Sequence, residues 1–87
     1  MIRTEKKCDL CLTRYTLEVH HCIHGSGRRK LADEDGLTVY LCHGCHMYLH
    51  DHRKVDIEYI RLAQRWYEEH IGDREQFRKR YGKSWLE

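Results

Sequence analysis

Two short stretches of the chain alternate between apolar and polar residues, which is the period of a β-strand with one buried face. The first, residues 15–21, places Leu17 and Val19 on one face and polar side chains on the other. The second, residues 37–41, alternates in the same way. Between them, a Gly-Ser-Gly break and a charged sequence over residues 25–36 predict a loop. The pattern therefore predicts two strands joined by a long polar loop.

Two helices are predicted directly after the second strand. The first is short and should run from about residue 44 to residue 52. Beyond Lys54 the apolar residues fall three or four positions apart, as in an amphipathic helix. These residues are Tyr59, Ile60, Ala63, Trp66, Tyr67 and Ile71. Gly72 follows them, where a helix-ending glycine is expected.

The last helix is predicted from its capping residues. Asp73 is a good N-cap residue, and Gln76 three positions later completes a capping box. Phe77 and Tyr81 then share one face, and Gly82 is expected to end the helix. Strand, loop, strand and three helices make a small α+β fold, and no linker or repeat divides residues 1–87, so we expect a single domain.

The composition indicates that burial alone does not stabilise this fold. Only 40% of the 87 residues are apolar and one is Phe, whereas eight are His and five are Cys. No run of about 18 apolar residues occurs, and the first residues lack the apolar segment of a secretory signal. We therefore expect a cytoplasmic protein without a membrane partner. In that reducing compartment, clustered cysteines favour metal binding over disulfides.

Cys8-x-x-Cys11 and Cys42-x-x-Cys45 are two matched pairs with metal-ligand spacing. Each pair can place two thiolates on one cation, and together they complete a closed tetrahedral site for structural Zn²⁺. The alternative is a pair of redox dithiols or unrelated buried cysteines. That alternative is disfavoured, because both cysteine pairs have the same spacing and the chain has only a small core. Cys22 is left over, and we expect it to be a small buried apolar side chain.

The histidines predict a second metal site. His46 and His50 lie four residues apart on the expected short helix, so their imidazoles share one face. His20 and His21 end the first strand, where neighbouring side chains point to opposite faces, and one of them can join the helical pair. Three protein ligands with open positions are typical of a catalytic divalent ion. A further histidine beside such an ion can act as a general base at neutral pH, since the ordinary pKa of histidine is about 6.5.

These residues resemble the signature of the HNH nucleases, in the ββα-metal (His-Me finger) superfamily. The resemblance rests on EVHHCIHG at residues 18–25, LTVYLCHGCH at residues 37–46, and His50-Asp51. The motif-bearing core spans about residues 8–52, and a helical extension follows over about residues 55–87. The whole chain is similar to small HNH proteins of phages and prophages, some of them linked to recombination.

The resemblance implies a zinc-stapled core of a two-stranded hairpin and a helix. It implies that His20, His46 and His50 bind a catalytic divalent ion, which would be Mg²⁺, Mn²⁺, Ni²⁺ or Zn²⁺. His21 would then be the general base, and the four paired cysteines would form the zinc knuckle found in one branch of the family.

One departure from the family pattern concerns how the base is held. Many HNH nucleases carry an Asn shortly before the Leu-Cys end of the second strand, and it helps to orient the catalytic histidine. This chain has no Asn, and Gly36 or Leu37 occupies that place. We expect a loop carbonyl, Asp33 or Asp35 to orient His21 instead.

The function that the resemblance implies is metal-dependent hydrolysis of phosphodiester bonds in DNA, inside a bacterial host cell if the chain is phage-encoded. Candidate phosphate contacts are His24, Arg28, Arg29 and Lys30, and the alternative for the basic run is a solvated turn. Basic residues between Arg74 and Lys83 either follow DNA or solvate a helix face. Such nucleases act as monomers or as homodimers, and recombination or packaging proteins are candidate partners.

Two other functions fit the same sequence. The first is a non-catalytic zinc-binding module that binds nucleic acid, in which the histidine cluster has no activity. The second is an adaptor that docks on a larger complex through the amphipathic helix over residues 59–71. We favour a core role for that helix face, because a chain with so few apolar residues needs Ile60, Trp66 and Ile71 inside.

Overall fold

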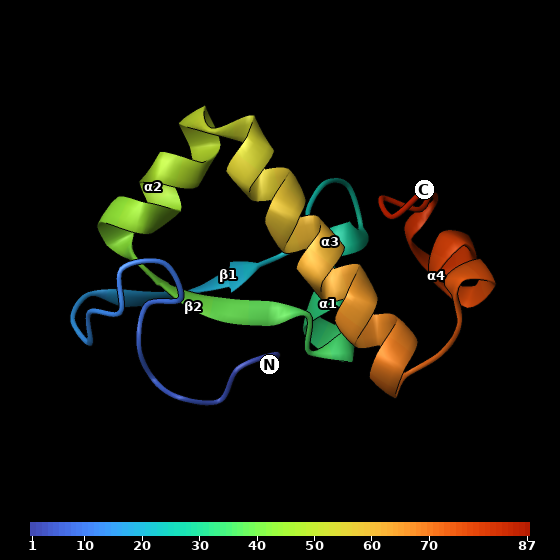
Figure 1. The fold of residues 1–87 in the computed structure, drawn as a ribbon, viewed down its shortest axis with the longest axis horizontal. Helices are drawn as coiled ribbons and strands as arrows, with labels where there is room; N and C mark the ends of the chain where they lie inside the picture. Colours follow the sequence, from blue (N-terminus) through green and yellow to red (C-terminus); the bar gives the residue numbers. More distant parts are fainter.

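An antiparallel pair of strands lies toward one end of the molecule, and four helices complete the fold (Figure 1). The computed structural model describes residues 1–87. Its elements are β1 (Leu17–His21), α1 (Arg28–Asp35), β2 (Thr38–Cys42), α2 (His43–Asp51), α3 (Arg53–His70) and α4 (Arg74–Tyr81). This is a small α+β arrangement, as the order of patterns predicts.

The register of the hairpin places His20 and His21 at the C-terminal end of β1, opposite the start of β2. Leu17 pairs with Cys42 at one end and His21 with Thr38 at the other. The buried face of β1 carries His20, which is 6% exposed, whereas Val19 on the opposite face is 45% exposed. The reason is that α2 packs on the His20 side of the hairpin, so an imidazole rather than an aliphatic chain enters the interior.

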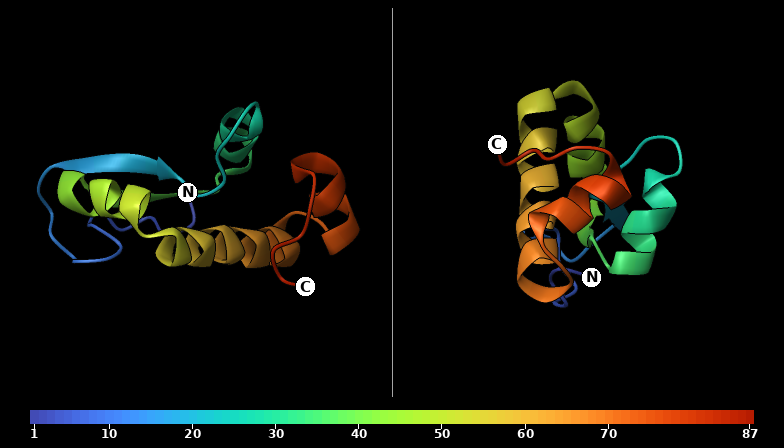
Figure 2. Two further views of the ribbon diagram at one scale, coloured as in Figure 1. Left: turned by 90° about the horizontal axis from the view of Figure 1, so that it is seen from above. Right: turned by 90° about the vertical axis from the view of Figure 1, so that its right-hand side faces the viewer.

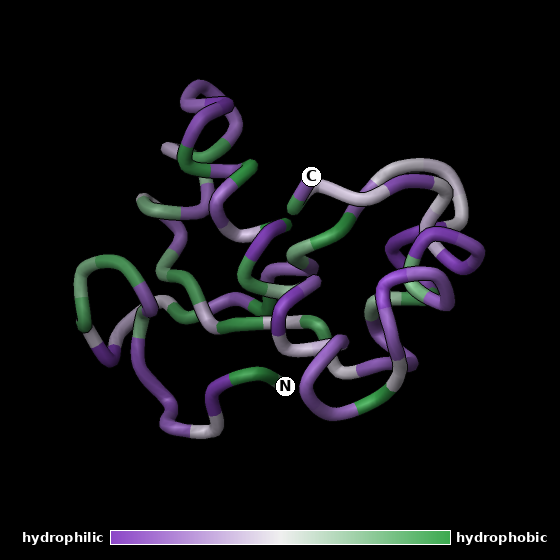
Figure 3. Tube along the Cα trace, turned by 45° about the vertical axis from the view of Figure 1, so that its right-hand side comes forward, coloured by the Kyte–Doolittle hydropathy of each residue, from purple (hydrophilic) through white to green (hydrophobic).

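The loop predicted between the strands is wrong over residues 28–35, which form the helix α1. Leu31 and Ala32 are its only apolar residues, so the sequence lacks a helical period there. The helix is bounded by Gly27 and Gly36, whose φ angles of 78° and 70° are left-handed and favour glycine. Contacts with β1 and α4 stabilise it. Figure 3 shows that hydrophilic residues dominate both α1 and α4.

The two C-terminal helices follow the predicted pattern closely. Asp73 accepts a hydrogen bond from the Gln76 backbone N–H while the Gln76 side chain accepts one from the Asp73 N–H, which confirms the capping box. Gly82 ends α4 with a φ of 92°. Gly72 serves a different purpose from the predicted one: its φ is not left-handed, and a Cβ there would collide with the Gln76 side chain.

The core lies between β2, α2 and one face of α3 and α4. Its largest fully buried side chains are Tyr81, Phe77, Ile23, Leu37, Leu41 and Gln64. Ile60 is buried and Trp66 is partly buried, as expected, but Ile71 is 45% exposed because it lies beyond the last turn of α3. Figure 2 shows α3 and α1 on opposite sides of the molecule, with α4 between them at one end. None of the helices is long and apolar enough to span a bilayer.

Candidate metal centre and histidine pocket

The four paired cysteines meet in one cluster. Their sulfur atoms all lie within 4.8 Å of one another, and the Sγ atoms of Cys11 and Cys42 are 3.6 Å apart. Cys8 and Cys11 come from a tight turn closed by a 2.8 Å hydrogen bond between the Cys8 N–H and the Thr13 carbonyl. Cys42 is the last residue of β2 and the N-cap of α2, and Cys45 lies in the first turn of that helix.

Backbone N–H groups point at two of these sulfurs and favour the thiolate form. The Cys11 N–H lies 3.5 Å from the Cys8 Sγ, and the Cys45 N–H lies 3.4 Å from the Cys42 Sγ. Burial alone would raise the pKa of Cys8, but backbone N–H donors outweigh it and lower that pKa to about 6. Burial and the neighbouring thiol groups raise the pKa of Cys45. Four sulfur ligands with no open position suit a structural ion such as Zn²⁺.

Cys22 lies outside this cluster. It is fully buried in the core, as predicted, and burial raises the pKa of its thiol to about 12. Such a thiol is a poor nucleophile and a poor metal ligand at neutral pH. The odd cysteine therefore contributes packing rather than chemistry.

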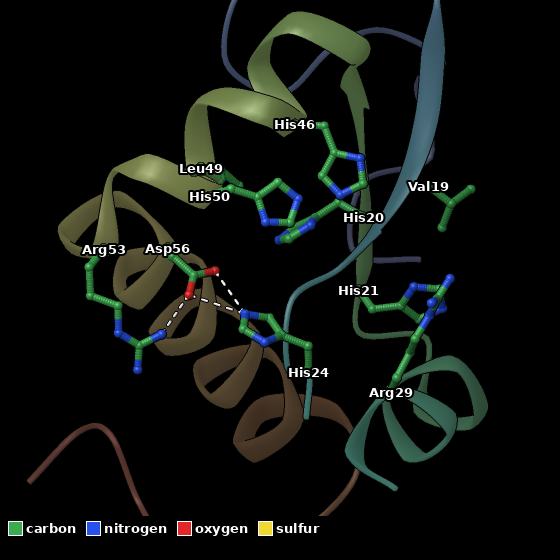
Figure 4. A pocket seen from close by; sticks show the side chains of 10 residues that line it. All are labelled: Val19, His20, His21, His24, Arg29, His46, Leu49, His50, Arg53 and Asp56. Carbon is green, nitrogen blue, oxygen red and sulfur yellow. Dashed lines mark hydrogen bonds and ion pairs between the residues drawn. The ribbon is translucent and has the colours of Figure 1, made fainter. Parts of the chain in front are cut away.

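Five of the eight histidines line one pocket, which has a volume of about 460 Å³ (Figure 4). They are His20, His21, His24, His46 and His50. The first two end β1, the third follows it, and the last two project from α2 one turn apart. Arg29, Arg53 and Asp56 also line the pocket, so it joins residues from β1, α1, α2 and α3.

Three of these rings lie near one another in the pocket. The ring centroids of His20 and His46 are 5.1 Å apart, and those of His46 and His50 are 5.7 Å apart. Their nitrogens are less tightly gathered than the sulfurs: the four cysteines are the one group of potential metal ligands whose donor atoms all lie within 4.8 Å of one another. The three rings nevertheless face a shared volume (Figure 4).

His20 has an unmet hydrogen-bonding group. Its Nε2 is buried and has no hydrogen-bond partner, which is costly for a polar atom. Burial, followed by the neighbouring His46, lowers the pKa of His20 to about 4. The ring is therefore neutral at pH 7, with a lone pair free for a ligand. An orphaned imidazole nitrogen beside two further imidazoles fits a divalent ion held by His20, His46 and His50.

Glu18 orients His46, a role that the sequence motif does not indicate. The His46 Nδ1–H donates to Glu18 Oε1 at 2.8 Å, and His43 Nδ1 lies 2.9 Å from Glu18 Oε2. These two hydrogen bonds lower the pKa of Glu18. Because a carboxylate only accepts, Nδ1 of His46 carries the hydrogen and Nε2 is left as a donor atom for a metal. The signal was in the alternation of β1, which puts Glu18 on the same face as His20.

His21 points to the other side of the strand and meets a carboxylate there. Its Nε2 lies 3.2 Å from Asp33 Oδ1, on α1. Of the three candidates for orienting His21, which were Asp33, Asp35 and a loop carbonyl, Asp33 is therefore the one that contacts the ring. Asp35 instead accepts hydrogen bonds of 2.6 Å from Arg80 and Tyr81. With Nε2 held by Asp33, Nδ1 is the nitrogen of His21 that remains available as a base.

Only two of the four candidate phosphate contacts line the histidine pocket. Arg29 lines the histidine pocket, and so does His24. The guanidinium of Arg28 lies 5.7 Å from the centre of the Trp85 ring, in a cation–π contact, and Lys30 is exposed away from the pocket lining. His24 is not free either, because its Nε2 lies 3.1 Å from both carboxylate oxygens of Asp56.

Asp56 and Arg53 also belong to the pocket wall, and the sequence alone did not indicate them. Asp56 is buried and accepts a 2.7 Å hydrogen bond from Arg53, three residues earlier on α3. A charged pair at this spacing in the first turn of a helix is common on protein surfaces, so it carries no signal in the sequence.

Comparisons with protein-family models, curated proteins and solved structures return no match.

Proposed function

We propose that this chain is a metal-dependent endonuclease of the HNH kind, which hydrolyses phosphodiester bonds in DNA. The observation that supports it best is the buried, unpartnered Nε2 of His20 beside the rings of His46 and His50, in an open pocket. A merely structural histidine would have a hydrogen-bond partner. His21 also lines this pocket, and Asp33 holds its ring from outside the lining, so the pocket has a candidate base.

Each pocket residue has a distinct part in this reaction. A divalent ion, when bound, stabilises the negative charge that develops on the phosphate and the leaving 3′ oxygen. His21 accepts a proton from the attacking water through Nδ1, and Asp33 holds the ring and stabilises the imidazolium that results. Arg29, from α1, places a fixed positive charge at the same pocket and binds the phosphate backbone. The Cys₄ cluster holds structural Zn²⁺ and takes no part in the chemistry.

Nicking of supercoiled plasmid tests the proposal. The zinc-loaded protein is assayed with Mg²⁺, Mn²⁺, Ni²⁺ or added Zn²⁺, and again after chelation of the weakly bound ion. We expect metal-dependent nicking, and a decrease of about 10²–10⁴-fold for His21→Ala because the base is lost. His70→Ala is the matched control, since His70 is an exposed histidine on α3 that does not line the pocket.

Two outcomes would contradict the proposal. An unchanged rate for His21→Ala would show that the base is wrongly assigned. DNA binding without cleavage in any metal would support the non-catalytic zinc module instead. An adaptor that docks through the apolar face of α3 is disfavoured already, because Tyr59, Ile60 and Tyr67 on that face are buried in the core.

A further inference from the structure

Asp56 occupies a position on α3 where an apolar residue would be expected. It continues the buried stripe formed by Tyr59, Ile60, Ala63 and Tyr67, and it is itself buried. A carboxylate in such a position costs free energy unless it is paired, and replacing a buried ion pair by apolar groups is often neutral or stabilising. Packing therefore gives no reason for a carboxylate at this position.

The partners of Asp56 leave part of the carboxylate available. The Asp56 side chain is 8% exposed, whereas those of Arg53 and His24 are 65% and 47% exposed. Oδ2 accepts from both Arg53 and His24, but Oδ1 accepts from His24 alone. A carboxylate oxygen has two acceptor sites, so Oδ1 keeps one for a further ligand.

This carboxylate lines the same pocket as the three gathered imidazoles. Figure 4 shows Asp56 and His24 on the α3 side of the pocket, opposite His46. Asp56 thus shares this pocket with His20, whose buried Nε2 lacks a partner.

We propose that Asp56 is a carboxylate ligand of the divalent ion in the histidine pocket, and that His24 and Arg53 are the residues that hold it in position. Ligating carboxylates are themselves normally hydrogen-bonded, and the hydrogen bonds that Asp56 accepts from His24 and Arg53 match that arrangement. His24 is then a positioning residue for Asp56 rather than a phosphate contact. The inference rests on the metal-binding part of the proposed function and is independent of cleavage.

The donor set determines which ions the pocket prefers. Three neutral imidazoles alone favour Ni²⁺, Cu²⁺ or Zn²⁺, whereas an added carboxylate oxygen also suits Mn²⁺ and Mg²⁺. The carboxylate further reduces the net charge of the loaded site by one. Removing it should therefore weaken Mn²⁺ binding more than Ni²⁺ binding.

Titration of the zinc-loaded full chain with Mn²⁺ tests this inference without a nuclease assay. Bound and free Mn²⁺ are separated by the EPR signal of the free ion, and Ni²⁺ affinity is measured by calorimetry. Asp56→Asn keeps the shape and an acceptor oxygen for Arg53 but removes the charge. Glu58→Gln is the matched control, since Glu58 lies two residues away on α3, is exposed, and pairs only with Arg61.

We expect Asp56→Asn to weaken Mn²⁺ binding about tenfold or more and Ni²⁺ binding by a smaller factor, with Glu58→Gln close to the unmodified protein. Thermal unfolding of the zinc-loaded variants without added Mn²⁺ verifies that each is folded. Equal Mn²⁺ affinity in folded Asp56→Asn would overturn the role of Asp56 and leave the histidine site standing. If the unmodified protein takes up no second ion, both this inference and the proposed metal-dependent function are wrong.

Discussion

Removal of the ion from the cysteine cluster should unfold this domain. Structural Zn²⁺ contributes on the order of 10 kcal/mol or more of folding free energy in small domains. At about 0.05–0.15 kcal/mol per residue, a chain of 87 residues has a total stability of about 4–13 kcal/mol. The binding free energy of the ion is therefore as large as the whole stability. Two cysteines of the cluster, Cys8 and Cys42, are also part of the buried core, so losing a bound ion should disrupt packing as well.

The assay combines metal content with a folding signal. Zinc is removed with a strong chelator and counted, while circular dichroism follows the helices and Trp fluorescence follows the C-terminal core. Cys42→Ser should reproduce the effect because it removes one of four ligands. Cys22→Ala is the matched control: it removes a fully buried cysteine outside the cluster, so zinc content should stay unchanged and the loss should be about 1–2 kcal/mol.

One result would refute this reasoning. If the chain, with its zinc verifiably removed, still melts cooperatively with undiminished helix signal, then the core alone supports the fold. The sulfur cluster would in that case be incidental to stability. The same result would contradict the inference, drawn from an apolar fraction of 40%, that burial is insufficient.

Three further predictions concern single side chains. Arg80→Ala should lower the free energy of unfolding by about 2 kcal/mol in urea denaturation, because the largely buried Asp35 carboxylate loses a charged donor. Glu18→Gln should weaken binding of the second ion about tenfold in calorimetry, because the hydrogen bond that orients His46 loses its charge. Without that ion, the folded His20 resists protonation down to about pH 4, whereas the unfolded chain accepts the proton near about pH 6.5. The free energy of unfolding should therefore fall as the pH drops through this range, by at most about 3 kcal/mol, and His20→Gln should flatten the slope.

Local patterns predicted most of the fold because they depend on neighbours in the sequence. The capping box at Asp73 and the glycine at Gly82 are decided within one helical turn, and both appear as expected. The helix α1 was missed for the opposite reason. Its boundaries come from two left-handed glycines, and Arg80, 45 residues after Asp35, stabilises it through an ion pair. No window of sequence contains that contact.

In the candidate site, too, the contacts within one helix follow from the sequence and the contacts between distant elements do not. The spacing of His46 and His50 on one helix predicts that their rings meet, and their centroids are 5.7 Å apart. The two carboxylates, Asp33 and Asp56, behave differently, because each comes from a separate helix: Asp33 on α1 contacts His21, and Asp56 on α3 lines the pocket. Asp33 is one of three groups that the sequence offers for holding His21, whereas nothing in the sequence marks Asp56, since an acidic residue in the first turn of a helix usually serves the helix itself.

The helices after residue 52 help to form the pocket and are not merely an addition to the motif-bearing core over residues 8–52. The first of them, α3, supplies Asp56 and Arg53 to the pocket wall. The second, α4, fixes α1 through Arg80, and α1 carries both Asp33 and Arg29. A hairpin and one helix would thus retain the gathered histidines but lose the support of the proposed base, His21, and of the proposed phosphate contact, Arg29. The extension is therefore part of the site, and its charged residues, which look like an ordinary solvated surface in the sequence, determine how the pocket is built.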